Sequence, residues 1–193
     1  DMSRMLSYAK LFNGDLSKWD VSSVEDIGMM FYFAPAFNSD LSNWDVSSVK
    51  QMDSVFYNAE TFNGDVSKWD VSNTKDMFAM FFKAAAFNVD ISKWRVRGVA
   101  SMENMFFRAA SFNRKLCGAD WVNSKATKVT MFASSYGSIS ATPCTTGAAL
   151  APRSKEELKN IVGACLILSR KGDCSNAPNG PIGEWDVSQV TDM

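Results

Sequence analysis

The sequence contains no histidine, and this absence narrows the possible functions before any motif is considered. Histidine is the commonest general base in enzymes and the commonest side-chain ligand of transition metals. Without it the chain has no Ser-His-Asp or Cys-His set, and no P-loop or dinucleotide-binding fingerprint occurs. We therefore expect no catalytic, cofactor-binding or metal-binding residues, and we predict that the protein is not an enzyme.

The chain also has little net charge and no long apolar run. Its 193 residues include 20 basic and 21 acidic side chains, for a net charge of −1. This balance gives no reason to expect a nucleic-acid partner, because such binding rests on clustered Lys and Arg. No run of about 18 apolar residues occurs, so no membrane span is predicted in this segment. Apolar residues still make up 46% of the chain, enough for a packed core.

What the sequence does contain is a repeat of 25 residues. An Ala, a Phe-Asn pair and a Trp return at this interval over the first 116 residues. The asparagines are Asn13, Asn38, Asn63, Asn88 and Asn113, and the tryptophans are Trp19, Trp44, Trp69 and Trp94. A fixed period of this size is typical of a solenoid, in which each repeat contacts only its neighbours. We predict that both columns form structural ladders from coil to coil.

Two patterns within each repeat predict its local structure. The alternation in Trp19-Asp20-Val21 is typical of a short strand with one buried face. In residues 27–34 the apolar side chains follow i, i+3, i+4, i+7 spacing, which indicates a helix of about two turns. Each repeat is therefore expected to be one strand, one short helix and a return through the Phe-Asn corner.

The repeat resembles known families. Leu16-x-x-Trp19-x-Val21 is similar to the opening of leucine-rich repeats, although a Val or Thr stands at their Asn or Cys position. The stretches Trp19-Asp-Val-Ser-Ser-Val24 and Trp44-Asp-Val-Ser-Ser-Val49 resemble, more specifically, the BspA-like surface-protein repeats, and the likeness covers residues 2–116 and 180–193. It implies a family of cell-surface and secreted proteins with no established catalytic residues. The expected fold is an α/β solenoid, a leucine-rich-repeat-like right-handed stack of strand–short helix coils with a helical cap.

The period fails after Phe112, and a different organisation follows. We expect four segments: a repeat solenoid over 1–116, a degenerate last coil and disulfide-pinned cap over 117–152, an amphipathic cap helix and linker over 153–178, and the first coil of a next solenoid block over 179–193. The cap helix would begin at a capping box in residues 154–157. Residues 183–193 match the start of a coil, and Met193 falls at the repeat position of Met2. We therefore also expect tandem copies of this block in a longer parent protein.

All four cysteines lie outside the best repeats. They are Cys117, Cys144, Cys165 and Cys174. An even number confined to irregular segments indicates disulfides and an extracellular or cell-surface location. The preferred pairing is Cys117–Cys144 and Cys165–Cys174, one of three possible connectivities. Zinc binding would need closer Cys spacing than this chain has.

One column of side chains is a possible interface. An aromatic residue follows the core Phe of four repeats, at Tyr32, Tyr57, Phe82 and Phe107. These side chains either widen the buried stripe or form an exposed ladder that stacks on sugar rings or packs against another fibre.

Two polar features have a simple structural interpretation beside a functional one. The aspartates before the Trp motif, Asp15, Asp40, Asp65 and Asp90, are expected to cap turns, because calcium loops need denser oxygen ligands. Arg95 and Arg97 break the charge pattern of the fourth repeat. With Lys93 they form either a basic contact point or part of a solvated face.

The leading hypothesis for function is an extracellular structural or scaffold protein. Its tandem solenoid blocks would self-associate into a surface fibre, hair or wall component without any cofactor. The alternative is a cell-surface adhesin or receptor ectodomain that binds a protein or glycan through the repeat face. A carbohydrate-active enzyme using acidic pairs is a third hypothesis, disfavoured because no nucleophile–base pair is present.

Overall fold

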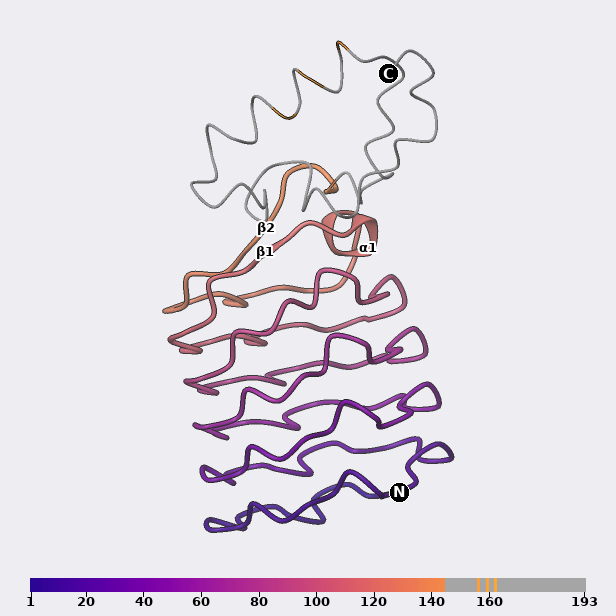
Figure 1. Cartoon of the computed structure of the whole chain (residues 1–193), viewed down its shortest axis with the longest axis vertical. Helices are drawn as coiled ribbons and strands as arrows, with labels where there is room; N and C mark the ends of the chain where they lie inside the picture. Colours follow the sequence, from indigo (N-terminus) through magenta and orange to yellow (C-terminus); the bar gives the residue numbers. More distant parts are fainter. Residues whose placement is uncertain (145–155, 157–158, 160–161, 163–193) are drawn as a thin grey trace. The chain divides into compact units, whose positions relative to one another are not determined.

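The computed structural model describes residues 1–144 together with Glu156, Lys159 and Val162, and it divides the chain into two units. The first unit, Asp1–Thr142, carries the repeats (Figure 1). In the second unit, Pro143–Met193, the three isolated described residues are helical. The remainder of the expected cap helix and linker, the Cys165–Cys174 pair and the coil expected at 179–193 lie outside the described residues.

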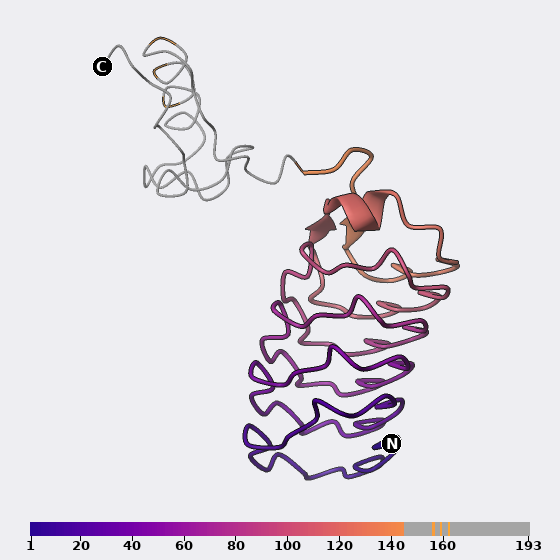
Figure 2. The same ribbon diagram turned by 90° about the vertical axis from the view of Figure 1, so that its right-hand side faces the viewer.

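Within Asp1–Thr142, successive 25-residue segments lie one above another as flattened coils (Figures 1 and 2). Parallel bridges join equivalent positions of neighbouring coils, at Asp26, Gln51, Asp76, Ser101 and Thr127. Beside these bridges, backbone N–H groups donate to the next coil at every second residue. For example, the N–H of Met29 donates to the Asp53 carbonyl at 2.8 Å, and that of Phe31 to the Val55 carbonyl at 2.9 Å. Neighbouring coils are therefore joined by a backbone ladder.

The segment expected to form a helix is built from tight turns instead. In residues 27–34 the N–H of Met30 bonds to the Ile27 carbonyl and that of Ala34 to the Phe31 carbonyl, each three residues back. The alternate N–H groups point to the next coil. A helix would use its amides within the segment, whereas turns leave half of them for the ladder. Two successive four-residue turns put their first and last residues toward the core, which reproduces the spacing that predicted a helix.

The third residue of each of these turns has a left-handed backbone. Met29 and Phe33 have φ values of 57° and 54°, and their equivalents in the other coils behave alike. Type II turns place positive φ at this position, where Gly or Asn is preferred. Here most occupants carry ordinary side chains, so the conformation is held by the surroundings. The N–H of Phe33, for instance, donates to the Tyr57 carbonyl at 2.8 Å in the next coil.

The segment expected to form a strand also consists of turns. The N–H of Trp19 bonds to the Leu16 carbonyl, and the N–H of Val24 bonds to the Val21 carbonyl. Asp15 and Asp20 reinforce these turns by accepting the N–H of the residue two positions ahead. The strand–short helix description is therefore wrong for these described coils, although the positions predicted to face the core do so.

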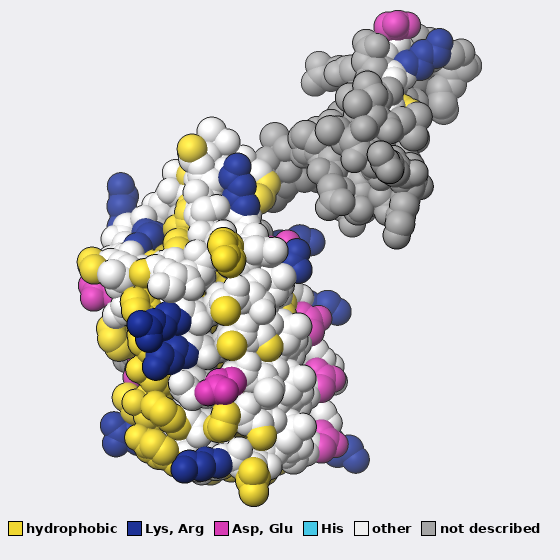
Figure 3. All heavy atoms as spheres, turned by 90° about the vertical axis from the view of Figure 1, so that its left-hand side faces the viewer, with side chains coloured by type: hydrophobic (Ala, Val, Ile, Leu, Met, Phe, Trp, Pro, Cys, Tyr) yellow, Lys and Arg dark blue, Asp and Glu magenta, His cyan; other side chains and the backbone are white. Residues whose placement is uncertain are grey.

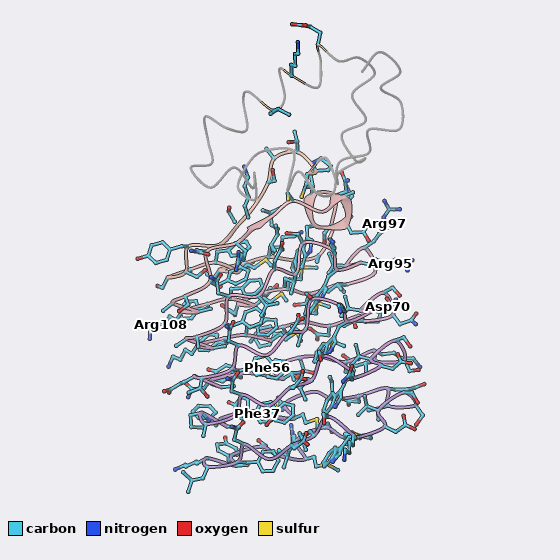
Figure 4. All side chains as sticks on the ribbon, in the orientation of Figure 1. Phe37, Phe56, Asp70, Arg95, Arg97 and Arg108 are labelled. Atoms are coloured by element: carbon cyan, nitrogen blue, oxygen red, sulfur yellow. The ribbon has the colours of Figure 1, made fainter. Side chains whose placement is uncertain are left out.

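The core is a continuous column of turn-corner side chains. Phe31, Phe56, Phe81 and Phe106 are fully buried and stack on one another with ring centroids 5.5–5.6 Å apart. Each also meets the Phe of the Phe-Asn corner in its own coil; the Phe56 and Phe62 centroids are 3.8 Å apart. Figure 4 shows Phe37 and Phe56 inside the stack, between Arg108 at one edge and Arg95 and Arg97 at the other.

Within Asp1–Thr142 the regular elements are short and belong to the last coil. They are β1 (Lys115–Leu116), α1 (Ala119–Val122) and β2 (Ser138–Ile139), and β1 pairs with β2 in parallel. Gly118 precedes α1 where the chain passes close to the coil before it. A Cβ at this position would clash with the Ser92 carbonyl oxygen. Coil-to-coil bonds continue past residue 117, since the N–H of Met102 donates to the Thr127 carbonyl.

Candidate interaction surface

The aromatic column lies on one edge of the stack and is half-buried. The ring centroids of Tyr32 and Tyr57 are 4.7 Å apart, those of Tyr57 and Phe82 are 4.3 Å apart, and those of Phe82 and Phe107 are 4.8 Å apart. We call this set the aromatic ladder. It is neither wholly core nor wholly exposed, because each ring packs on its neighbours and keeps part of its surface open.

Two further aromatic residues join the ladder at its N-terminal end. The Tyr8 ring stacks on Phe33 and meets Tyr32 edge-on, with both centroid distances at 5.5 Å. Tyr8 is 62% exposed. Neither residue belongs to the column predicted from the sequence, although Tyr8 and Phe33 are one 25-residue step apart and Phe33 directly follows Tyr32.

The way the rings stack decides which parts of them can contact a ligand. The Tyr57 and Phe82 planes differ by 5°, so their faces cover each other and only the edges point outward. Lys83 and Arg108 lie beside the ladder, 5.8 Å from the Phe82 centroid and 5.4 Å from the Phe107 centroid. Figure 3 shows hydrophobic side chains gathered in a band along this side of the stack, with Lys and Arg beside them. The outer surface of the ladder is therefore apolar ring edge flanked by cations.

The ladder has no acid–base chemistry near neutral pH. Burial raises the pKa of Tyr32 and of Tyr57 above the usual tyrosine value of about 10. Both hydroxyls therefore remain protonated and can act only as hydrogen-bonding groups.

The asparagine column forms a continuous chain of hydrogen bonds. The backbone N–H of Asn38 donates to Oδ1 of Asn13 at 2.8 Å, and Asn63 donates to Asn38 in the same way. The contacts continue through Asn88 to Asn113, at 2.9 and 3.2 Å. Most of these residues are exposed, so the bonds hold the corner of one coil to the next rather than satisfy groups in a dry core.

The tryptophan column carries a second chain of bonds, inside the stack. Nε1–H of Trp44, Trp69 and Trp94 donates to a backbone carbonyl of the preceding coil at 2.9–3.0 Å. Trp121 makes the same contact with the Ile91 carbonyl, although it comes 27 residues after Trp94. Trp19 is 38% exposed and makes no such bond to the described residues. The insertion in the last coil is thus absorbed without losing the ladder.

The aspartates before the Trp motif act on their own turns. Oδ1 of Asp15, Asp40, Asp65 and Asp90 accepts the N–H of a serine two residues ahead at 2.9 Å. These bonds to serine hold the pKa of Asp15, Asp40 and Asp65 below the usual value. In the described part of the chain, no group of three or more His, Cys, Asp or Glu side chains is placed to hold a metal ion.

Two sequence predictions concern the chain's covalent links and membrane segments. Cys117 and Cys144 form a disulfide, which confirms this half of the predicted pairing. Across the described residues, no helix has the length and apolar character needed to cross a lipid bilayer.

In the described residues, stacked coils tied by side-chain ladders define a repeat protein. The chain belongs to the family described as Mycoplasma protein of unknown function, DUF285, whose sequence profile matches residues 1–81 and 40–141. No curated protein and no solved structure matches the chain.

Proposed function

We propose that this chain is a non-enzymatic structural protein of the cell surface or extracellular space. In this proposal the stack is a right-handed, leucine-rich-repeat-like solenoid of the BspA-like kind. Copies of it, in tandem or as separate chains, assemble into a fibre, hair or wall component. The observation that carries the proposal is the continuity of the ladders along the stack.

The ladders support a mechanical role because they connect each described coil to the next. The asparagine bonds run from Asn13 to Asn113 along one corner, and tryptophan bonds run through the core. Each Phe ring of the core also packs on its counterpart above and below. A force along the stack would therefore act on many equivalent bonds in parallel columns. This arrangement suits a rigid rod.

The aromatic ladder offers a route to side-by-side association. A row of apolar ring edges along one side of a rod is the kind of exposed patch that marks protein–protein contact. Lys83 and Arg108 would limit the register in which two such rows can meet, because like charges directly opposite each other repel. Sugar stacking, which the alternative adhesin function would use, needs open ring faces, and most of those faces are covered by neighbouring rings.

The first experiment is electron microscopy of native material and of the purified chain. Filaments with a regular axial repeat in both samples would support the proposal. Dispersed single particles in both samples would contradict it and favour an adhesin or receptor ectodomain.

A variant separates assembly from folding. Tyr57→Ser combined with Phe82→Ser should abolish lateral association while the far-ultraviolet circular dichroism spectrum stays native. Tyr136→Ser is the matched control, because Tyr136 is 82% exposed and makes no ring contact with the described residues. Filaments that persist in the double variant would remove the ladder from the proposal. Tyr57→Phe keeps the ring and removes only the hydroxyl, so it should fold and still associate, because the apolar ring edge is retained.

A further inference from the structure

The turn that follows the Trp motif has a regular acidic cap in three coils and loses it in the fourth. Asp20, Asp45 and Asp70 each accept, through Oδ1, the backbone N–H of the serine two residues ahead at 3.0 Å. In the next coil the aspartate position holds Arg95 and the serine position holds Arg97. One capping carboxylate has therefore been replaced by two guanidinium groups.

The backbone keeps the same turn without this carboxylate. The N–H of Val99 bonds to the Val96 carbonyl at 3.2 Å, and the equivalent bond from Thr74 to Val71 is 3.0 Å long. The N–H of Arg97 is thus in the position that receives a carboxylate oxygen in the other coils. It donates to no acceptor within the described residues, and Arg97 is exposed. In this turn the backbone N–H can donate to a carboxylate oxygen, but the chain supplies no aspartate at position 95 to accept it.

The surface around this turn is hollowed and cationic. A pocket of about 450 Å³ is lined by Ser72, Arg95, Arg97, Gly98 and Asp120. A second pocket of about 410 Å³ shares Arg95 and adds Lys68, Lys93 and the acidic Asp70. Arg95 and Arg97 extend from the edge of the stack opposite Arg108 (Figure 4). Across the two pockets, the lining holds four cationic side chains and two acidic ones, Asp70 and Asp120.

Asp120 is the acidic side chain that faces these arginines in the first pocket. Its Oδ1 lies 3.7 Å from Nε of Arg97, too far for a hydrogen bond, and the Arg97 side chain is 79% exposed. An ion pair of this kind contributes little stability and leaves the guanidinium donors available to a ligand. Asp120 therefore weakens the binding of an anion here but does not occupy the guanidinium donors.

We propose that these two adjoining pockets, which we call the arginine pocket, bind the carboxylate groups of an acidic saccharide. The Arg97 amide would take one carboxylate oxygen, as the serine amides do in the other coils, and the guanidinium of Arg95 or Arg97 would hold the pair of oxygens. A saccharide is favoured because each pocket has room for more than a carboxylate. The shared Arg95 also suits two consecutive acidic sugars, with the hydroxyl groups of Ser67 and Ser72 in the lining. The arginine pocket is separate from the aromatic ladder and does not depend on fibre formation.

The test is a titration of the full chain with trigalacturonate, followed by nuclear magnetic resonance of the Arg97 amide and by calorimetry. Saturable binding with a large shift of the Arg97 amide, weakened by added salt, is the expected result. Arg95→Asp combined with Arg97→Ser rebuilds the acidic cap of the other coils and should lower the affinity at least tenfold. Lys10→Asp combined with Lys125→Ser changes the net charge equally at two exposed positions and should leave the affinity within about twofold.

The outcomes separate a built site from general attraction. If both double variants lose affinity equally, or if trigalacturonate does not move the Arg97 amide, the proposal is overturned. It is also overturned if an aspartate-rich peptide binds the arginine pocket more tightly than trigalacturonate, since the ligand would then be a protein. Asp120→Asn should raise the affinity for trigalacturonate several-fold, because it removes a negative charge from the pocket; a loss of affinity would also overturn the proposal.

Discussion

The tryptophan bonds can be tested by replacing Trp69 with Phe. Trp69 is 3% exposed, its ring stacks between Trp44 and Trp94 at 6.4 Å on both sides, and its Nε1–H donates to the Leu41 carbonyl at 3.0 Å. Phe keeps an aromatic ring in the column and removes the donor. The substitution therefore isolates the coil-to-coil bond better than Ala would.

The expected cost follows from what each group loses. The Leu41 carbonyl still accepts the N–H of Trp44, so it is not left wholly unpaired, and the lost bond should cost about 1 kcal/mol. The smaller ring leaves a void between its neighbours, which adds about 1–2 kcal/mol in a core that cannot fully relax. We expect Trp69→Phe to lower the free energy of unfolding by about 2–3 kcal/mol. Trp19→Phe should cost less than about 0.5 kcal/mol, because Trp19 is 38% exposed and makes no such bond to the described residues.

Urea denaturation followed by circular dichroism measures both variants against the wild-type chain. The slope of unfolding free energy against urea should not change, so the midpoint reports stability directly. Equal losses for Trp69→Phe and Trp19→Phe would refute the reasoning, because position in the ladder would then carry no energy. A loss below about 0.5 kcal/mol for Trp69→Phe would refute it as well.

Three more predictions concern charge and backbone. Hydrogen bonds from serine lower the pKa of Asp20 and Asp45. The stability that these bonds provide is present above the unfolded-state pKa and is lost as the pH falls through the folded-state pKa, so the urea midpoint of unfolding should drop below about pH 4. Burial and the neighbouring Asp76 and Asp26 raise the pKa of Asp53, so its ionised form opposes folding at pH 7. Asp53→Asn should therefore raise the melting temperature at pH 7. A gain that persists at pH 3 would contradict this explanation. Ser134 is exposed with φ at 60°, so Ser134→Gly should stabilise by about 0.5 kcal/mol in urea denaturation, whereas Ser111→Gly, where φ is not positive, should destabilise.

The sequence predicted which residues face the core but not the backbone that places them there. Ile27, Met30, Phe31 and Ala34 are all buried, as their spacing predicted. The same spacing fits a two-turn helix and two consecutive four-residue turns, because both bring positions three and four apart to one face. A left-handed residue at Met29 or Phe33 has no signal in a single sequence, since neither is Gly or Asn. Local propensity therefore could not distinguish the two backbones.

The candidate surfaces, like the core, were predicted from the sequence only in part. The aromatic ladder and the asparagine column are visible in the sequence as columns of period 25, and the structure gives their geometry. Trp121 breaks that period and still enters the tryptophan ladder, through an insertion that no fixed period reveals. The arginine pocket needed both kinds of information. The sequence shows that Arg95 and Arg97 depart from the repeat, and only the structure shows that the position they occupy is one where a carboxylate meets a backbone amide.

The turn backbone has a consequence for how the stack folds. Twelve non-glycine residues in the described chain have positive φ, two in each coil, and each costs about 1–2 kcal/mol in isolation. Within one coil, residues 27–34 send four N–H groups to the next coil, from Ile27, Met29, Phe31 and Phe33. Four such bonds contribute about 2–6 kcal/mol, which offsets the 2–4 kcal/mol cost of the left-handed pair only when the next coil is in place. A single coil should therefore be unfolded, and folding should spread from coil to coil by adding each new turn segment to a formed neighbour.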